Sequence, residues 1–219
     1  MSYHIDDEQV TLTALRKRIE SNDLVPSRVA LLDGITEKFE LLETQGIRTF
    51  DKLRYELKNP KRLNALATAS KIDQAYLVLL RREIESYFPK PFKLTEFTWM
   101  PQEEIQKLVE HGLNNSAAFY EATMSDADAS ALQVATNVDA EILQKLRKLV
   151  NLTRVQWVSP NTARMIILSG YSSAAELAAA DADELAAGLN RVNEGGRFYK
   201  GKIGMRDIKR LIHAAGYVG

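Results

Sequence analysis

The chain has 219 residues, and its 29 basic and 29 acidic side chains give a formal net charge of zero. Hydrophobic residues make up 45% and charged residues 26%, which supplies enough apolar material for a core and argues against intrinsic disorder. The absence of cysteine excludes disulfides, thiolate nucleophiles and cysteine-ligated metal sites, and the zero net charge provides no global attraction to nucleic acid.

The N-terminal sequence MSYHIDDEQV lacks the basic-then-apolar order of a signal peptide. No apolar run approaches the roughly 18 residues that a transmembrane helix requires. We therefore expect a cytoplasmic protein with no membrane partner.

Apolar residues recur at helical spacing along almost the whole chain. Those of residues 10–19 fit one face of a first helix, which we expect to end near residues 21–22. Pro26 marks a connection, and Ser27 is placed to cap the next apolar segment. Extended alternation is nearly absent, and the β-branched cluster at residues 155–158 is too short to build a sheet on. The sequence therefore predicts an all-α fold.

Two stretches of the chain match each other position by position. When Gly46 is aligned with Gly112, apolar residues fall at the same offsets, and so do Asp73 in the first stretch and Asp139 in the second. The matched apolar pairs are Phe39 and Ile105, Leu42 and Leu108, Ile47 and Leu113, Leu53 and Phe119, Leu77 and Leu143, and Leu80 and Leu146. A third copy begins at Ala163, matches at Ile166, Gly170, Tyr171 and Leu177, and then diverges. We interpret the chain as tandem copies of one helical unit.

The glycine of each copy predicts a helix end. Gly46, Gly112 or Gly170 can adopt a positive φ without a Cβ clash, and the apolar residue after it can pack back on the helix it has just left. The N-caps expected for the following helices are Thr49, Ser116 and Ser173.

The second half of each copy contains small polar residues that suit another helix start. In the first copy this is Ser70 or Asp73, and in the second it is Thr136, Asn137 or Asp139. We interpret the two aspartates as caps or as first-turn partners of the helix dipole. No histidine or second carboxylate recurs beside them, so we expect no metal or acid–base role.

The third copy differs because its corresponding segment, NEGGRFYKGKIG at residues 193–204, is rich in glycine and basic residues. A helix is expected after it, over residues 205–215. Between residues 191 and 210 the basic side chains exceed Glu194 and Asp207 by five. This segment is the strongest candidate for a binding site in the chain.

Phe198 and Tyr199 interleave aromatic rings with these charges, as in some nucleic-acid sites. The alternative is a solvated loop whose lysines only keep it soluble. The candidate nucleic-acid-binding residues are Arg197, Lys200, Gly201, Lys202, Gly204, Arg206, Lys209 and Arg210.

Residues 42–53, LETQGIRTFDKL, resemble the L-x-x-x-G-I-x-T-x-x-x-L half of a helix-hairpin-helix domain. That pattern occurs in the C-terminal domain of the bacterial RNA polymerase α subunit and in many DNA repair proteins. Residues 11–28 and 158–218 also resemble an uncharacterised bacterial helix-hairpin-helix family of unknown function. The resemblance implies tandem helix-hairpin-helix (SAM-like) repeats, which is an expectation about fold more than about function.

The first two copies depart from the pattern of DNA-binding hairpins. Such hairpins usually carry a G-x-G turn, whose backbone N–H groups approach a phosphate at a helix N-terminus. Residues 68–73 and 134–139 contain no glycine, and each segment ends in an aspartate that would repel phosphate. We expect these two copies to be structural and the third to bind.

Other features predict no catalytic or cofactor site. His4, His111 and His213 are isolated, with no ligand-type partner at helical spacing, so no metal site is expected. Neither a nucleophile elbow nor a P-loop is present. An uncharted enzyme would need a polar pocket with perturbed titratable groups.

Two further expectations concern packing. Trp99 and Trp157 each precede a proline at a junction between copies, and we expect both to be wedges between units. The alanine-rich run at residues 174–187 is expected to be helical by propensity.

We expect two domains, divided near residues 93–99, where Pro89 and Pro91 interrupt the helical pattern. Residues 1–95 would hold the N-terminal helix and the first unit, and residues 96–219 the second and third units. The predicted function is non-enzymatic binding of DNA or RNA backbone, without sequence specificity, through the third hairpin. The alternative is a protein–protein interaction scaffold.

Overall fold

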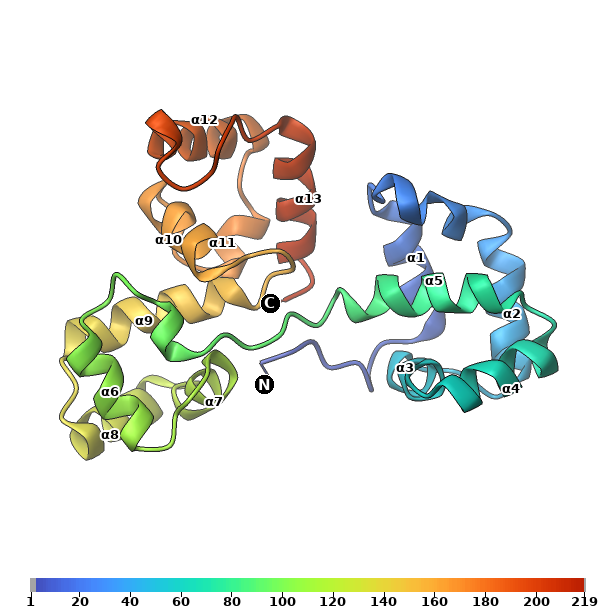
Figure 1. The fold of residues 1–219 in the computed structure, drawn as a ribbon, viewed down its shortest axis with the longest axis horizontal. Coiled ribbons are helices and arrows are strands. Elements are labelled where there is room, and N and C mark those ends of the chain that lie inside the picture. Colours follow the sequence, from blue (N-terminus) through green and yellow to red (C-terminus); the bar gives the residue numbers. More distant parts are fainter. Residues whose placement is uncertain (1–2, 219) are drawn as a thin grey trace. The chain divides into compact units, whose positions relative to one another are not determined.

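The computed structural model describes residues 3–218, and every regular element in this range is a helix (Figure 1). The predicted all-α class is therefore confirmed. The chain forms two compact units: residues 6–88, the N-terminal unit, and residues 89–218 together with residues 3–5, the C-terminal unit. The chain passes from the N-terminal unit to the main part of the C-terminal unit between Phe88 and Pro89.

The N-terminal unit contains five α-helices and one 3₁₀ helix within its residues 6–88. They are α1 (Leu12–Ser21), η1 (Pro26–Leu32), α2 (Ile35–Thr44), α3 (Phe50–Lys58), α4 (Pro60–Ser70) and α5 (Gln74–Glu85). The first helix ends at Ser21, as its apolar spacing predicts. Ser27 is not a cap, because the 3₁₀ helix begins one residue earlier at Pro26, with Val25 in the cap position.

The C-terminal unit holds the remaining helices described. They are η2 (Leu94–Glu96), α6 (Gln102–Glu110), α7 (Ser116–Ala122), α8 (Asp126–Thr136), α9 (Ala140–Thr153), α10 (Pro160–Leu168), α11 (Ala174–Ala178), α12 (Ala182–Val192), η3 (Glu194–Gly196) and α13 (Met205–Ala215). The helix expected at residues 205–215 is confirmed. The alanine-rich run is not one helix, because the Asp181 side chain accepts from the Asp183 and Glu184 N–H groups and starts a new helix there.

The residues that match between the two stretches form much of the core of each unit. In the N-terminal unit Leu42, Leu53, Leu77 and Leu80 are fully buried. Their counterparts in the C-terminal unit, Leu108, Phe119, Leu143 and Leu146, are equally inaccessible. Apolar burial is the main favourable contribution to folding. The two stretches share the spacing of their apolar residues because those residues form the core of each unit.

Glycine ends three helices with the geometry that the sequence predicts. Gly46, Gly112 and Gly170 have φ angles of 79°, 92° and 107°. After the first of them, the Ile47 N–H donates to the Leu42 carbonyl at 3.2 Å, which is the closing bond of a Schellman motif. The equivalent bonds run from Leu113 to Leu108 at 3.0 Å and from Tyr171 to Ile166 at 3.2 Å.

In each of the first two stretches, the turn between the last two helices reverses the chain without a glycine. Lys71 and Asn137 adopt left-handed φ angles of 59° and 53° after α4 and α8. Asp73 then caps α5, with Oδ1 accepting from the Ala75 N–H at 2.6 Å, and Asp139 caps α9 in the same way. The interpretation of both aspartates as caps is confirmed.

Two other expectations from the sequence are wrong. Asn115, not Ser116, caps α7: its side chain accepts from the backbone N–H groups of residues 117 and 118, whereas Ser116 is buried and is the first helical residue. Trp157 is not a wedge, because it is 57% exposed and has a φ of 68°. Trp99 is partly buried and packs edge-on against Phe97.

Replacing Lys71 by glycine is expected to raise the free energy of unfolding by about 0.5–1 kcal/mol. The gain comes from removing the left-handed strain of a residue with a Cβ, reduced by the larger backbone entropy of glycine in the unfolded chain. Asn137→Gly is the matched control and should change stability less, because asparagine tolerates this conformation. Urea unfolding measures both, and equal effects would contradict the explanation.

Candidate nucleic-acid interface

The structure brings the eight candidate residues together in one hairpin, formed by the loop after α12 and by α13. Arg197, Lys200, Gly201, Lys202 and Gly204 lie in the loop, and Arg206, Lys209 and Arg210 lie on α13. All except Arg210 are exposed. Arg210 is half-buried, and its Nη1 lies 3.7 Å from the Asp207 carboxylate, so its charge is partly compensated. We call residues 193–210 the basic hairpin.

Asn193, at the end of α12, holds the basic hairpin in shape. This buried side chain donates to the carbonyls of Tyr199 at 2.9 Å and Gly201 at 3.1 Å. Its Oδ1 accepts from the N–H groups of Phe198 at 3.0 Å and Tyr199 at 2.8 Å. One amide group therefore satisfies both donors and acceptors of the loop backbone, leaving the basic side chains outside.

Asn190, one turn earlier on α12, fixes the other end of the loop. Its Oδ1 accepts from the Ile203 N–H at 3.1 Å, and its Nδ2 donates to the Ile203 carbonyl at 3.3 Å. Sequence reasoning identified neither asparagine, because asparagine near a helix end is common and its bonds to residues 5–13 positions away are visible only in three dimensions.

Asn193→Ala is expected to destabilise the C-terminal unit by about 1–3 kcal/mol, because part-buried backbone groups of the loop lose their partners. The loss should be accompanied by faster amide exchange and faster proteolysis between residues 197 and 202. Asn161→Ala, at an exposed position of α10, is the control and should change neither stability nor exchange of the loop. Unchanged exchange in Asn193→Ala would show that Asn193 does not order the loop.

The start of α13 differs from the equivalent helix starts in the first two stretches. Helices α5 and α9 begin with the carboxylates of Asp73 and Asp139, whereas Gly204 occupies the cap position of α13 and has no side chain. The N–H groups of Asp207 and Ile208 donate hydrogen bonds to the Gly204 carbonyl at 3.0 and 3.1 Å. The cap position of α13 therefore carries no carboxylate, although Asp207 in the first turn places Oδ2 3.8 Å from where a Gly204 Cβ would lie and pairs with Arg210.

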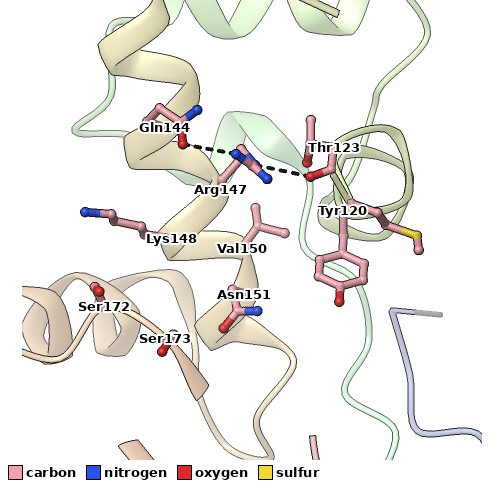
Figure 2. A pocket seen from close by; sticks show the side chains of 10 residues that line it. Tyr120, Thr123, Gln144, Arg147, Lys148, Val150, Asn151, Ser172 and Ser173 are labelled. Atoms are coloured by element: carbon pink, nitrogen blue, oxygen red, sulfur yellow. Dashed lines mark hydrogen bonds between the residues drawn. The ribbon is translucent and has the colours of Figure 1, made fainter. Parts of the chain in front are cut away.

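A pocket of about 340 Å³ lies elsewhere in the C-terminal unit, among α7, α9 and the turn before α11 (Figure 2). Arg147 extends toward Thr123, and its guanidinium donates to the Thr123 carbonyl at 3.2 Å and to Gln144 at 3.1 Å. Asn151 accepts from the Ala174 N–H at 2.8 Å. These polar side chains connect α9 to its neighbours, so we assign them a structural role.

A buried polar cluster joins the N-terminal segment of the C-terminal unit to α7 and to the end of α9. The Ser116 hydroxyl donates to the Tyr3 hydroxyl at 3.0 Å, which donates in turn to the Thr153 carbonyl at 3.2 Å. Burial raises the pKa of Tyr3 and lowers the pKa of the neighbouring Arg154. Ser116, expected to be a cap, is thus one member of this cluster.

Within residues 3–218, no three histidine or acidic side chains are placed to hold a metal ion. In the same range, no helix combines the length and the apolar character that crossing a lipid bilayer requires.

Among known protein families, one described as a domain of unknown function (DUF4332) matches residues 99–217. The matched range begins at Trp99 and includes the whole basic hairpin. No curated protein and no solved structure matches the chain.

Proposed function

The chain belongs to the DUF4332 family, whose description assigns no activity, and we propose that it is a non-enzymatic protein that binds nucleic-acid backbone through the basic hairpin. Binding would be largely independent of sequence, because phosphate contacts supply most of the energy in such interfaces.

The observation that supports the proposal most directly is the contrast between the third helix start and the first two. In α5 and α9 an aspartate occupies the cap position, where it would repel a phosphate. In α13 that position is Gly204, and Lys200, Lys202 and Arg206 are exposed around it. A helix N-terminus flanked by exposed cations attracts an oxyanion through both the dipole and the charges.

We also propose that the three stretches are tandem helix-hairpin-helix units. Each begins with a helix closed by a Schellman glycine, followed by a shorter helix. The first two share a further detail: the residue three positions after the glycine, Thr49 or Asn115, forms an isolated antiparallel bridge with an earlier segment. These common features support one repeated unit, with the third adapted for binding.

The proposal is tested by fluorescence anisotropy with a labelled DNA duplex at two salt concentrations. If about five phosphates are contacted, raising the salt from about 50 to about 200 mM should weaken binding about 500-fold. Absence of binding at the lower salt, both to the duplex and to a single strand of the same length, would overturn the proposal. Affinity independent of salt would also contradict it.

The alternative function, a protein–protein scaffold, is favoured by one observation. Val134 on α8 is 83% exposed, and Leu168 at the end of α10 is 51% exposed. Exposed apolar side chains of this size contribute to protein interfaces when they belong to a larger patch. Salt-insensitive recovery of one stoichiometric protein partner, which Val134→Ser abolishes, would support the scaffold instead.

A further inference from the structure

An arginine of α10 lies between two aromatic rings beside the basic hairpin. The Arg164 guanidinium carbon is 5.1 Å from the centre of the Trp99 ring and 5.6 Å from the centre of the Phe198 ring. Trp99 precedes α6, whereas Phe198 belongs to the hairpin loop, so the group joins three separate segments of the C-terminal unit. All three side chains are partly exposed.

Within residues 3–218, the Arg164 guanidinium makes no ion pair and no hydrogen bond. Its N–H donors are therefore available to an acceptor from outside, while its charge lies within cation–π distance of both rings. The aromatic setting without a carboxylate distinguishes Arg164 from a structural arginine such as Arg54, which binds both Asp7 and Glu85.

A second arginine lies near the same phenylalanine ring. The Arg197 guanidinium lies 5.3 Å from the centre of the Phe198 ring, and the next residue, Tyr199, is 57% exposed. Aromatic rings and guanidinium planes interleaved beside a basic backbone-binding loop are what successive unpaired bases stack on. In a duplex those base faces are occupied by neighbouring base pairs.

We propose that the basic hairpin, together with Trp99 and Arg164, binds single-stranded nucleic acid in preference to duplex. The loop cations would contact the backbone, and unpaired bases would stack on Trp99, Phe198 and Tyr199. This inference rests on the proposed nucleic-acid function but adds the strand state of the ligand. Charge alone favours the opposite preference, because a duplex has the higher charge density.

Trp99 itself can report the contact. The chain has two tryptophans, so Trp157→Phe leaves Trp99 as the only tryptophan emission. We expect a single-stranded oligothymidylate to quench that emission and to bind about tenfold more tightly than a duplex of the same length. Equal or weaker affinity for the single strand, or binding that leaves Trp99 emission unchanged, would overturn this inference while the proposed function stands. Binding to neither ligand would overturn both.

Arg164→Lys tests the role of this arginine, because it keeps the positive charge and removes the planar guanidinium group. It should lower single-strand affinity about fivefold and change duplex affinity less than twofold. Arg82→Lys, at an exposed position of α5, is the matched control and should change neither affinity. An equal loss for both ligands in Arg164→Lys would show that the residue acts through charge or folding alone. If that variant does not fold, Trp99 quenching in the Trp157→Phe protein still decides between the outcomes.

Discussion

Replacing Arg154 by methionine is expected to lower the free energy of unfolding of the C-terminal unit by about 2–4 kcal/mol. Arg154 follows α9 and is buried. Its guanidinium binds both the N-terminal segment and the C-terminal residues of the unit. Nε donates to the Tyr3 carbonyl at 2.9 Å, and Nη2 donates to the Val218 carbonyl at 2.9 Å. The guanidinium also lies 4.2 Å from the centre of the Tyr120 ring.

Two opposing effects decide the size of this loss. Methionine has a similar length but no donors, so two buried carbonyls lose partners, at about 1–3 kcal/mol each. Removing a buried charge relieves its desolvation and offsets part of that cost. Burial lowers the pKa of Arg154, which reflects this desolvation, but the side chain stays charged at neutral pH.

Urea unfolding followed by circular dichroism measures the effect. Arg154→Lys should lower the free energy of unfolding by an intermediate amount. A single ammonium group then replaces a guanidinium that donates hydrogen bonds in two directions. Arg82→Met, on an exposed position of α5, should stay within about 0.5 kcal/mol of the wild type. A loss no larger than that for Arg154→Met would show that the arginine does not hold the two ends.

Reversing three charges of the basic hairpin is expected to have the largest effect on binding. In the triple variant Lys200→Glu, Lys202→Glu and Arg206→Glu, three phosphate contacts become repulsive, so affinity at low salt should fall on the order of a hundredfold or more. The slope of log affinity against log salt should also decrease by about three. Anisotropy titrations over a range of salt measure both quantities.

The control is a triple reversal with the same change in net charge. Lys58, Lys61 and Lys145 are exposed lysines outside the hairpin, and their replacement by glutamate should weaken binding only slightly, because it makes the same change in net charge and leaves every hairpin cation in place. Equal losses in the two triple variants would mean that global charge, not the hairpin, governs binding.

Local rules were sufficient to predict several elements from the sequence. Glycine at Gly46, Gly112 and Gly170 predicted three Schellman ends, because the positive φ and the apolar residue after it are properties of adjacent residues. Asp73 and Asp139 were recognisable as caps for the same reason.

Longer-range features could not be predicted from local sequence. The alanine-rich run satisfies helix propensity throughout, yet Asp181 divides it, and Gly188 on α12 approaches Ser169 so closely that an added Cβ would lie 3.1 Å from the serine Cβ. Trp157 has no neighbour in sequence that predicts a left-handed backbone.

The candidate site was predicted in part. Its basic residues follow one another in sequence, so composition alone located the loop. Arg164 and Trp99 are 65 positions apart, and their contact depends on the packing of α10 against distant segments. The Asn193 bonds likewise depend on a loop conformation that propensity does not encode. Arg210 was included among the candidate residues, although its i,i+3 spacing from Asp207 on the predicted helix is compatible with the ion pair that the structure shows.

Hydrogen exchange of the protein with and without an excess of DNA tests most directly whether the third hairpin is the binding site. The account predicts slower amide exchange within residues 197–208 on binding. It also predicts unchanged exchange at residues 68–76 and 134–142, where aspartates cap the corresponding helices. Protection confined to those two turns, or DNA binding that leaves residues 197–208 unprotected, would contradict it.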